Sequence, residues 1–376
     1  MNIAIVNRTN LKNFGSVLQV YALCKAVNKL GHNVEVVWES GNMSKNFDIR
    51  FNKVIKIFTK LLAHPSLLKT TLKTLKGMGD AVVAPHQKQL FEEFVHSNFK
   101  RSFYSAKQIK QVASTERYQK FICGSDQIWS STTLYPDPMF YLRFAPKDKR
   151  IAYAPSIGRD YIPDYNQSTL RKYISDIPYV SIREDEGRRL ILDLTGRDVP
   201  VVADPTFLMS HNEWDKLKTD VDVPQFYILC YFLDEPSNEV KDAICDFANN
   251  QNRDIVVLGK LGALDYPSTR IFHPVAGPGE FLTLVSKSDM VITDSYHGML
   301  FAINYHKKFW SVERAYAEYN QSSRQLTVLM KLGLKDRHLK GDYHFNDTEI
   351  DYEIIQSKVD EFVDFSMNYL KDAINA

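Results

Sequence analysis

Short apolar runs alternate with longer amphipathic stretches from the start of the chain. Residues 3–6 predict a buried strand, and a polar loop follows at 7–14. A helix is expected to begin at Gly15-Ser16, with apolar residues at helical spacing, and to end at Gly31, a residue type that often closes helices. Residues 34–38 predict the next strand. This order, with a loop at the carboxyl end of the first strand, is the usual opening of a doubly wound α/β domain.

The same alternation continues along the rest of the chain. Further strands are predicted at 121–123, 151–153, 179–182 and 199–202, and a second strand–helix series at 227–231, 239–247, 255–258, 280–285, 290–293 and 309–312. Because 376 residues exceed one ordinary core, we predict two tandem Rossmann-like domains, 1–205 and 206–348, with a seam at Asp204-Pro205-Thr206. An amphipathic helix within 349–376 is expected to pack back on the first domain.

Residues 41–79 form a basic insertion in the first domain. Apolar residues recur at helical spacing over 51–62, while Lys53, Lys56 and Lys60 lie on another side of the same helix. A second basic helix is expected to carry Lys69, Lys73 and Lys76. The favoured interpretation is a helical hairpin that packs on its own domain and exposes its basic face. The alternative is peripheral contact with an anionic membrane surface.

Charge and cysteine usage narrow the class of protein. The 47 Lys and Arg balance 45 Asp and Glu, which argues against nucleic acid as the main partner. The four cysteines are scattered without metal-ligand spacing, so we expect buried thiols and no metal. The amino terminus lacks the features of a signal peptide, and no apolar run is long enough to span a bilayer. We therefore expect a cytoplasmic protein.

The most informative segment is 289–298, where a strand runs into Asp294-Ser295-Tyr296-His297-Gly298 and then into a helix. Ligands of open α/β sheets collect at such carboxyl ends. His297 is placed there to move protons, and the helix amino terminus beside it favours a bound anion. This turn predicts an enzyme that acts on an anionic substrate.

The opening loop is a second candidate. Gly15 permits close approach of the backbone, and Asn13 and Ser16 flank it; Ser16 is expected to cap the helix and to direct free N–H groups toward an anion. The loop lacks the GxGxxG pattern, so dinucleotide binding has little support. A plain tight turn is an equally good interpretation.

The third candidate, 124–129, follows the strand at 121–123 and contains Gly124, Ser125, Asp126, Gln127 and Trp129. An aromatic ring beside polar side chains is a common way to hold a sugar. The alternative is a helix cap with Trp129 in the core, and residue types alone do not separate the two.

Cations at strand ends are candidates for holding a phosphate or carboxylate. Arg183 ends the predicted strand 179–182 and can bind such a group through two parallel hydrogen bonds, although an ion pair with Glu184 is the common alternative. Lys260 follows the strand 255–258, and Arg324 opens an apolar helix. Both are weaker candidates.

Six motifs occur in one order along the chain: Asn-Phe-Gly-Ser-x-Leu-Gln at 13–19, Gly-Ser-Asp-Gln-Ile-Trp at 124–129, Arg-Glu at 183–184, Asp-Pro-Thr-Phe-Leu at 204–208, Gly-Pro-Gly-Glu-Phe-Leu at 277–282 and Thr-Asp-Ser-Tyr-His-Gly at 293–298. Together they resemble the polysaccharide pyruvyl transferase family. The resemblance implies a GT-B-like fold with the active site in an interdomain cleft, the acceptor on the first domain and the donor on the second. It also implies phosphoenolpyruvate as donor and a sugar of a surface glycan, or its lipid-linked precursor, as acceptor.

The resemblance also implies roles for these residues in ketal formation. His297 is expected to protonate the donor's methylene group. Asp126 or Asp294 is expected to act as base or to bind a hydroxyl, and the choice between them stays open. Arg183 is expected to hold the donor's anionic groups, helped by Lys260 and Arg324, with neutral donors from Ser295, Gly298 and the Ser16 N–H. No cofactor is expected.

Some relatives carry an Arg-Leu-His turn where this chain has Ser295-Tyr296-His297, so another basic residue must hold the donor here. Two alternatives to the pyruvyl transferase remain: a GT-B glycosyltransferase that uses a nucleotide sugar, and a non-catalytic glycan-binding member of the family. A peripheral position at the inner face of the membrane would suit a lipid-linked acceptor.

Overall fold

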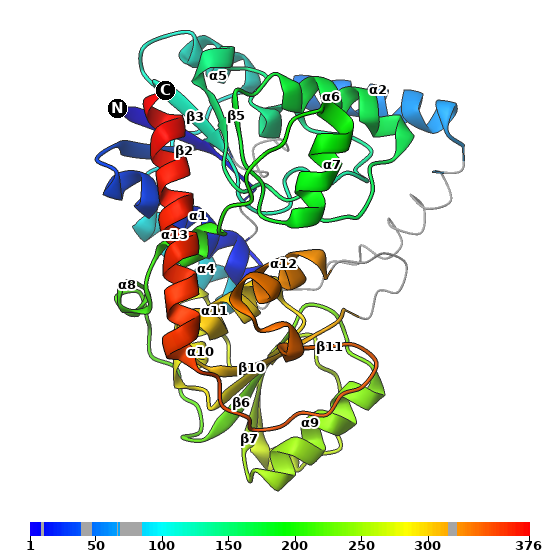
Figure 1. Ribbon diagram of the computed structural model, residues 1–376, viewed down its shortest axis with the longest axis vertical. Coiled ribbons are helices and arrows are strands. Elements are labelled where there is room, and N and C mark those ends of the chain that lie inside the picture. The colour runs from blue at the N-terminus through cyan, green and yellow to red at the C-terminus, as the bar shows by residue number, and fades with distance from the viewer. Residues whose placement is uncertain (9–10, 39–46, 66, 68–84, 315–321) are drawn as a thin grey trace.

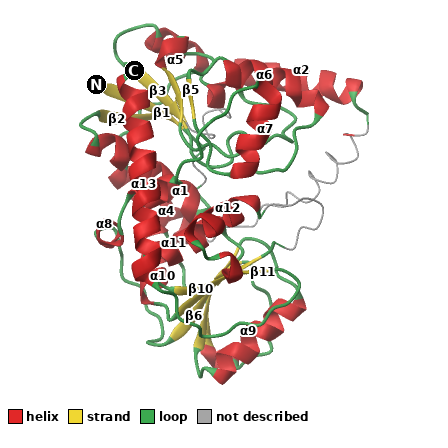
Figure 2. Cartoon of the chain, viewed as in Figure 1, coloured by secondary structure: helices red, strands yellow, loops and turns green. Residues whose placement is uncertain are grey.

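The chain folds into two α/β lobes stacked along its long axis (Figure 1). The computed structural model describes residues 1–8, 11–38, 47–65, 67, 85–314 and 322–376. Each lobe contains one parallel sheet (Figure 2). The strands of the first sheet all precede residue 181 and those of the second all follow residue 226. Two Rossmann-like domains in a GT-B-like arrangement are thus the observed fold.

The sheet of the N-terminal domain has the order β2-β1-β3-β4-β5, with all neighbouring strands parallel. Its strands are β1 (Asn2–Val6), β2 (Asn33–Trp38), β3 (Lys120–Cys123), β4 (Arg150–Ala152) and β5 (Tyr179–Val180). Its helices are α1 (Phe14–Lys29), α2 (Phe47–Ala63), α4 (Pro85–Asn98), α5 (Ala106–Ala113), α6 (Asp164–Ser175) and α7 (Asp185–Thr195), with short 3₁₀ turns η2 (Pro138–Tyr141) and η3 (Lys147–Lys149).

The sheet of the C-terminal domain has the order β11-β10-β9-β6-β7-β8 and is also parallel. Its strands are β6 (Tyr227–Phe232), β7 (Asp254–Gly259), β8 (Ile271–Phe272), β9 (Met290–Thr293), β10 (Lys308–Val312) and β11 (His338–Leu339). The helices are α8 (His211–Asp215), α9 (Asn238–Asn250), α10 (Pro278–Lys287), α11 (Tyr296–Asn304) and α12 (Ser323–Leu332), with 3₁₀ turns η4 (Pro205–Leu208), η5 (Ser268–Arg270) and η6 (Lys335–Arg337).

The last helix, α13 (Tyr352–Asn375), runs along both domains (Figure 1). Near its start, the Tyr352 hydroxyl donates to Lys307 O at 2.6 Å in the C-terminal domain. Near its end, Ser366 Oγ accepts from the Ala203 N–H at 2.8 Å, and Ser366 is fully buried. The expectation that this helix packs back on the first domain is confirmed.

Phe14 joins the two domains at the start of α1. Its ring stacks on Phe91 of α4 at 5.3 Å and on Phe281 of α10 at 4.7 Å, and Phe14 is only 4% exposed. Such stacked pairs contribute about 0.5–1.5 kcal/mol beyond the area they bury. The loop before α1 is therefore held against the C-terminal domain, which positions the residues that follow it.

Most of the predicted strands are confirmed, but 199–202 is wrong as a strand. This segment makes only an isolated bridge, between Val201 and Ile182. The short edge strands β8 and β11 were not expected, because two apolar residues do not separate a strand from a turn. All four cysteines are free and buried, as the sequence predicted. Within the described ranges, no helix is both long and apolar enough to cross a membrane.

The helix expected in the basic insertion is present as α2, but its orientation contradicts the favoured interpretation. Val54, Ile55, Phe58 and Leu62 are 44–65% exposed. The Lys56 and Lys60 ammonium groups instead lie over rings of the same domain, 5.7 Å from Tyr135 and 5.1 Å from Tyr165. Helical spacing defines two faces without deciding which one meets the protein. The second basic helix lies outside the described residues.

Candidate functional site

His297 stands in the first turn of α11, just beyond the carboxyl end of β9. The preceding Ser295 caps this helix, with its Oγ accepting from the Gly298 N–H at 3.2 Å. A β-carbon on Gly298 would lie 2.6 Å from Thr293 Oγ1, so only glycine fits the turn. Ser295 and Gly298 therefore shape the turn that presents His297.

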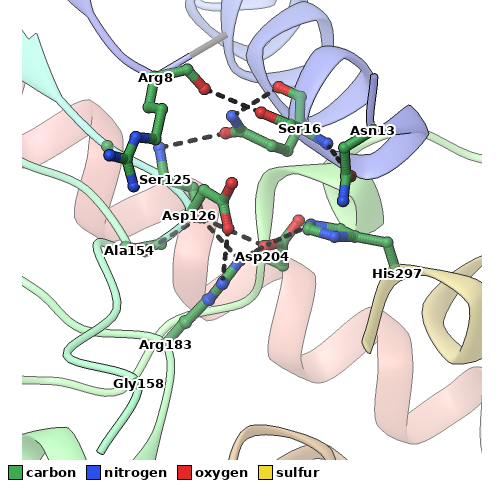
Figure 3. Close-up of polar contacts among 12 residues, drawn as sticks. Arg8, Asn13, Ser16, Ser125, Asp126, Ala154, Gly158, Arg183, Asp204 and His297 are labelled. Atoms are coloured by element: carbon green, nitrogen blue, oxygen red, sulfur yellow. Dashed lines mark hydrogen bonds and ion pairs between the residues drawn. The ribbon is translucent and has the colours of Figure 1, made fainter. Parts of the chain in front are cut away.

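The imidazole of His297 reaches across to the N-terminal domain. Its Nε2 lies 3.6 Å from Asp204 Oδ2, which is too long for a hydrogen bond but within ion-pair distance once the ring is protonated (Figure 3). The His297 side chain is 8% exposed, and Nε2 has no hydrogen-bond partner among the described residues. A buried ring nitrogen in this state is available for a ligand.

Arg183 lies at the centre of the site and is fully buried. Its Nη1 donates to Asp204 Oδ2 at 2.6 Å, and its Nη2 donates to Asp126 Oδ1 at 3.2 Å (Figure 3). Burial alone would lower the pKa of Arg183, but Asp204 and Asp126 outweigh it and raise that pKa. The guanidinium is thus permanently charged and hydrogen-bonded to two carboxylates, and a third, Glu184 Oε2, lies 4.0 Å from its Nε.

The same pairing keeps both carboxylates ionised. Burial would raise the pKa of Asp204, but His297 and Arg183 outweigh it and hold that pKa well below its ordinary value. The pKa of Asp126 is lowered in the same way, against its burial, chiefly by Arg183 and His297. Asp204 is fully buried, whereas the Asp126 side chain is 20% exposed. Asp126 is the carboxylate of this pair that a substrate can reach.

Arg324, at the start of α12, completes the cluster. Its guanidinium lies 5.6 Å from the centre of the Tyr296 ring, and Arg183 lies 4.6 Å from the same ring. Arg324 is 6% exposed, and within the described part of the chain it forms no hydrogen bond or ion pair; its buried Nε has no partner. Burial and the neighbouring Arg183 lower the pKa of Arg324 to about 10, so it remains a cation near neutral pH.

The loop at 124–129 is only partly as expected. Ser125 is buried, with its Oγ 2.8 Å from Ala154 O and 3.2 Å from Asp204 Oδ2, so it supports the Arg183–Asp204 pair rather than facing a substrate. Gly124 has φ 131°, and a β-carbon there would lie 1.9 Å from Tyr153 O. Gln127 packs on Gly158, where a β-carbon would lie 2.3 Å from its Nε2. This loop serves mainly to position Asp126.

The sugar-stacking interpretation of Trp129 is wrong. Trp129 is 1% exposed, its Nε1 donates to Phe140 O at 2.9 Å, and its ring stacks on Tyr141 with centroids 5.2 Å apart. Both the faces and the polar edge of the ring are therefore occupied inside the domain. The core position of Trp129 in the alternative interpretation is confirmed, but the expected helix cap is not, because no helix begins between β3 and η2.

The expected roles of the opening loop also need correction. Asn13, not Ser16, caps α1: Asn13 Oδ1 accepts from the Ser16 N–H at 2.9 Å, so this N–H is not free for an anion. Ser16 Oγ donates instead to Arg8 O at 2.9 Å (Figure 3). Gly15 does meet the site, because its backbone packs directly against the His297 ring.

Asp294 is a structural residue in this arrangement. Its two carboxylate oxygens accept from the Leu233 N–H at 2.7 Å and the Asp234 N–H at 3.0 Å, which braces the loop after β6. Burial raises the pKa of Asp294 to about 6. With both oxygens engaged, Asp294 is a poor candidate for the base, and Asp126 is favoured.

Lys260 is not brought into the cluster. It is exposed just after β7, and its charge acts on Glu235 at the same sheet edge. No contact within the described residues joins it to Arg183 or His297. Of the three cations predicted to hold the donor, Arg183 and Arg324 come together and Lys260 does not.

Two central residues were not predicted as part of the site. Asp204 was assigned to a domain seam and to one of the six motifs but was given no role, although an acid followed by proline at the end of an apolar run was the available clue. Tyr296 was noted only for its difference from relatives, yet both guanidiniums lie over its ring. In the described ranges, no group of acidic, His and Cys side chains has the arrangement of a metal site.

The strand ends of both sheets thus meet at a cluster of cations, carboxylates and one histidine, which is the arrangement of a two-domain transferase with a GT-B-like fold. The model of the polysaccharide pyruvyl transferase family matches residues 13–316. The chain belongs to this family. No curated protein matches the sequence.

The solved structures that resemble this fold share little sequence with it. A Listeria monocytogenes protein assigned as a UDP-N-acetylglucosamine 2-epimerase is 10% identical, with a TM-score of 0.50 over 99% of this chain and 90% of that one. MnaA of S. aureus with UDP is 10% identical, with a TM-score of 0.47 over 99% and 91%. The glycosyltransferase SnogD of Streptomyces nogalater is 12% identical, with a TM-score of 0.40 over 100% and 95%. At this identity the likeness concerns the fold alone.

Proposed function

We propose that the protein transfers the enolpyruvyl group of phosphoenolpyruvate to two hydroxyls of a sugar, in a glycan or its lipid-linked precursor. The product is a pyruvate ketal, and phosphate is released. The observation that supports this most directly is Arg324, a buried guanidinium next to the charged Arg183. Among the described residues it forms no hydrogen bond or ion pair, and Glu184 and Asp126 act on it only at longer range. A buried cation without a direct hydrogen-bonded partner is costly, so this position favours an anionic ligand.

Phosphoenolpyruvate offers a phosphate and a carboxylate to such a position. Because Asp204 and Asp126 already engage Arg183, we assign Arg324 as the principal donor clamp. Arg183 then acts mainly by holding the two carboxylates in place. The sequence analysis expected Arg183 to be the main clamp and Arg324 a weaker one, so this assignment reverses their order. Arg324 would then replace the arginine that some relatives carry at position 295.

His297 is the proton donor in this proposal. Protonation of the donor's methylene group makes the central carbon electrophilic, and the first sugar hydroxyl adds to it. Phosphate then leaves and the second hydroxyl closes the ketal. One hydroxyl proton replaces the proton given by His297, and the other leaves with phosphate. Asp126, ionised and partly exposed, binds a hydroxyl beside the ring.

The test combines thermal unfolding with phosphoenolpyruvate and phosphate release with surface-glycan fragments as acceptors. The wild-type protein should be stabilised by phosphoenolpyruvate, and Arg324→Gln should lose this effect. His297→Gln should keep the stabilisation but release phosphate about 10²–10⁴-fold more slowly, the usual contribution of a general acid. Lys260→Gln is the matched control and should behave as wild type.

Stabilisation of the wild type by UDP-N-acetylglucosamine, and not by phosphoenolpyruvate, would instead support a nucleotide-sugar glycosyltransferase. Near-normal phosphate release by His297→Gln would remove its role as acid. Acceptor binding without any phosphate release would support a non-catalytic member of the family.

A further inference from the structure

A groove with a volume of 520 Å³ lies between α2 and α6 of the N-terminal domain, and the loop at 134–136 contributes to it. This volume is within the usual range for small-ligand sites, about 300–1,000 Å³. Its cationic and aromatic lining residues are Lys56, Lys60, His64, Tyr135, Tyr165, Lys172 and Tyr173. None of these residues belongs to the cluster around His297.

The charged side chains that line the groove are all basic. No Asp or Glu is among its described lining residues, and within the described ranges Lys56, Lys60 and Lys172 form no ion pair. The partner of Lys60 is a neutral amide, Asn166 Oδ1 at 2.6 Å. Burial, with the like charge of Lys56, lowers the pKa of Lys60 to about 8. Several uncompensated cations around one groove favour an anionic ligand.

The rings of the groove add a second kind of recognition. Lys56 lies 5.7 Å from the centre of Tyr135 and Lys60 lies 5.1 Å from that of Tyr165. The His64 ring lies 5.7 Å from the Tyr165 ring. Hydroxyls of Thr59, Ser168 and Thr169 complete the lining. Aromatic faces next to hydroxyls and cations suit a sugar that carries a phosphate or carboxylate.

The groove is connected to the site around His297 through one loop. Residues 130–137 directly follow the loop that holds Asp126. Within them, the carboxyl of Asp137 interacts electrostatically with Lys53 on α2 and with Arg8, and both of these charges lower its pKa against the larger effect of burial. Arg8 lies beside Ser125 and Asp126 (Figure 3). Arg8, beside Asp126, and Lys53, on α2, therefore both act on Asp137, which directly follows the groove residue Pro136.

We propose that this groove binds an anionic sugar unit of the acceptor, one that carries a phosphate or a carboxylate. The identification of this ligand with the acceptor rests on the proposed function, whereas the groove's preference for an anionic sugar does not. A glycan bound there would extend toward Asp126, where its reacting hydroxyls are needed. The enzyme would then prefer charged acceptors over neutral ones.

The direct test uses three probes in NMR titrations: glucose 1-phosphate, methyl glucoside and inorganic phosphate. The Arg324→Gln background removes binding at the other cation cluster. We expect glucose 1-phosphate to bind at least about fivefold more tightly than either other probe. Lys60→Gln should weaken its binding about tenfold, and Lys107→Gln, at an exposed lysine of α5, should not change it.

In the phosphate-release assay, Lys60→Gln in the otherwise wild-type protein should raise the KM for an anionic acceptor about tenfold. Its kcat and its KM for phosphoenolpyruvate should stay unchanged. Equal binding of inorganic phosphate and glucose 1-phosphate would overturn the sugar preference, and unchanged titrations in Lys60→Gln would overturn the site. A Lys60-dependent association with phosphatidylglycerol vesicles, without sugar-phosphate binding, would make a lipid surface the occupant instead. Failure of all phosphoenolpyruvate turnover would refute the proposed function but leave the titrations valid.

Discussion

The backbone of Gly15 packs directly against the imidazole ring of His297, across the boundary between the two domains. A β-carbon added to Gly15 would lie 2.1 Å from Cγ and from Nδ1 of the ring. Phe14, the preceding residue, holds this loop against Phe281 of the C-terminal domain. The position of the proposed acid therefore depends on a glycine in the other domain.

Gly15→Ala should displace the His297 ring and reduce phosphate release at least about tenfold, because a small shift of a catalytic group has a large effect on rate. Overpacking of this kind also destabilises proteins by about 1–3 kcal/mol. Gly31→Ala, just beyond the other end of α1, is the control: no atom lies within 4 Å of its new β-carbon, so only its φ of 83° adds strain. Normal activity in Gly15→Ala would show that the ring position is not critical.

Asp204→Asn should destabilise the protein by about 3–5 kcal/mol, because it removes the closest counter-charge from a fully buried guanidinium. Asp198→Asn is the control, since its pair with Arg188 is about half exposed and such surface pairs contribute little to stability. Urea unfolding measures both. If both variants lose equally little unfolding free energy, another carboxylate, for example Asp126, must neutralise the charge of Arg183 when Asp204 is removed.

The sequence predicted the sheets well because each strand is a run of buried apolar residues between polar loops. It predicted His297 and Arg183 for the same reason: strand ends of parallel sheets converge. Which charges neutralise each other depends on tertiary placement. Asp204 lies next to both Arg183 and His297, and no local pattern in the sequence predicts these two contacts. The orientation of α2 could not be predicted either, because Lys56 and Lys60 face the domain only through the positions of Tyr135 and Tyr165.

Trp129→Phe should destabilise the protein by about 1–2 kcal/mol, because it removes the bond from Nε1 to Phe140 O. The KM for the acceptor should not change, since no face of the ring is available to a sugar. Trp214→Phe is the matched control: this residue is also fully buried, and its Nε1 donates to Thr206 O at 3.2 Å. A selective rise in acceptor KM for Trp129→Phe alone would restore the sugar-stacking interpretation.

Asp137 should make stability depend on pH. Burial raises the pKa of this carboxyl from 3.8 to about 6, and Oδ2 has no hydrogen-bond partner among the described residues. Since the folded state binds the proton more tightly than the unfolded state, the stabilisation is complete below about pH 4 and is lost as pH rises through about 6. Two pKa units correspond to roughly 3 kcal/mol.

Asp137→Asn cannot titrate and keeps an oxygen to accept from the Met139 N–H, which Oδ1 now binds at 3.0 Å. Relative to this variant, the wild-type protein should therefore lose up to about 3 kcal/mol of unfolding free energy between pH 4 and pH 7. Urea unfolding across this range measures the difference, with Asp160→Asn at an exposed position as the baseline. A constant difference between wild type and Asp137→Asn would show that the buried carboxyl keeps its ordinary pKa.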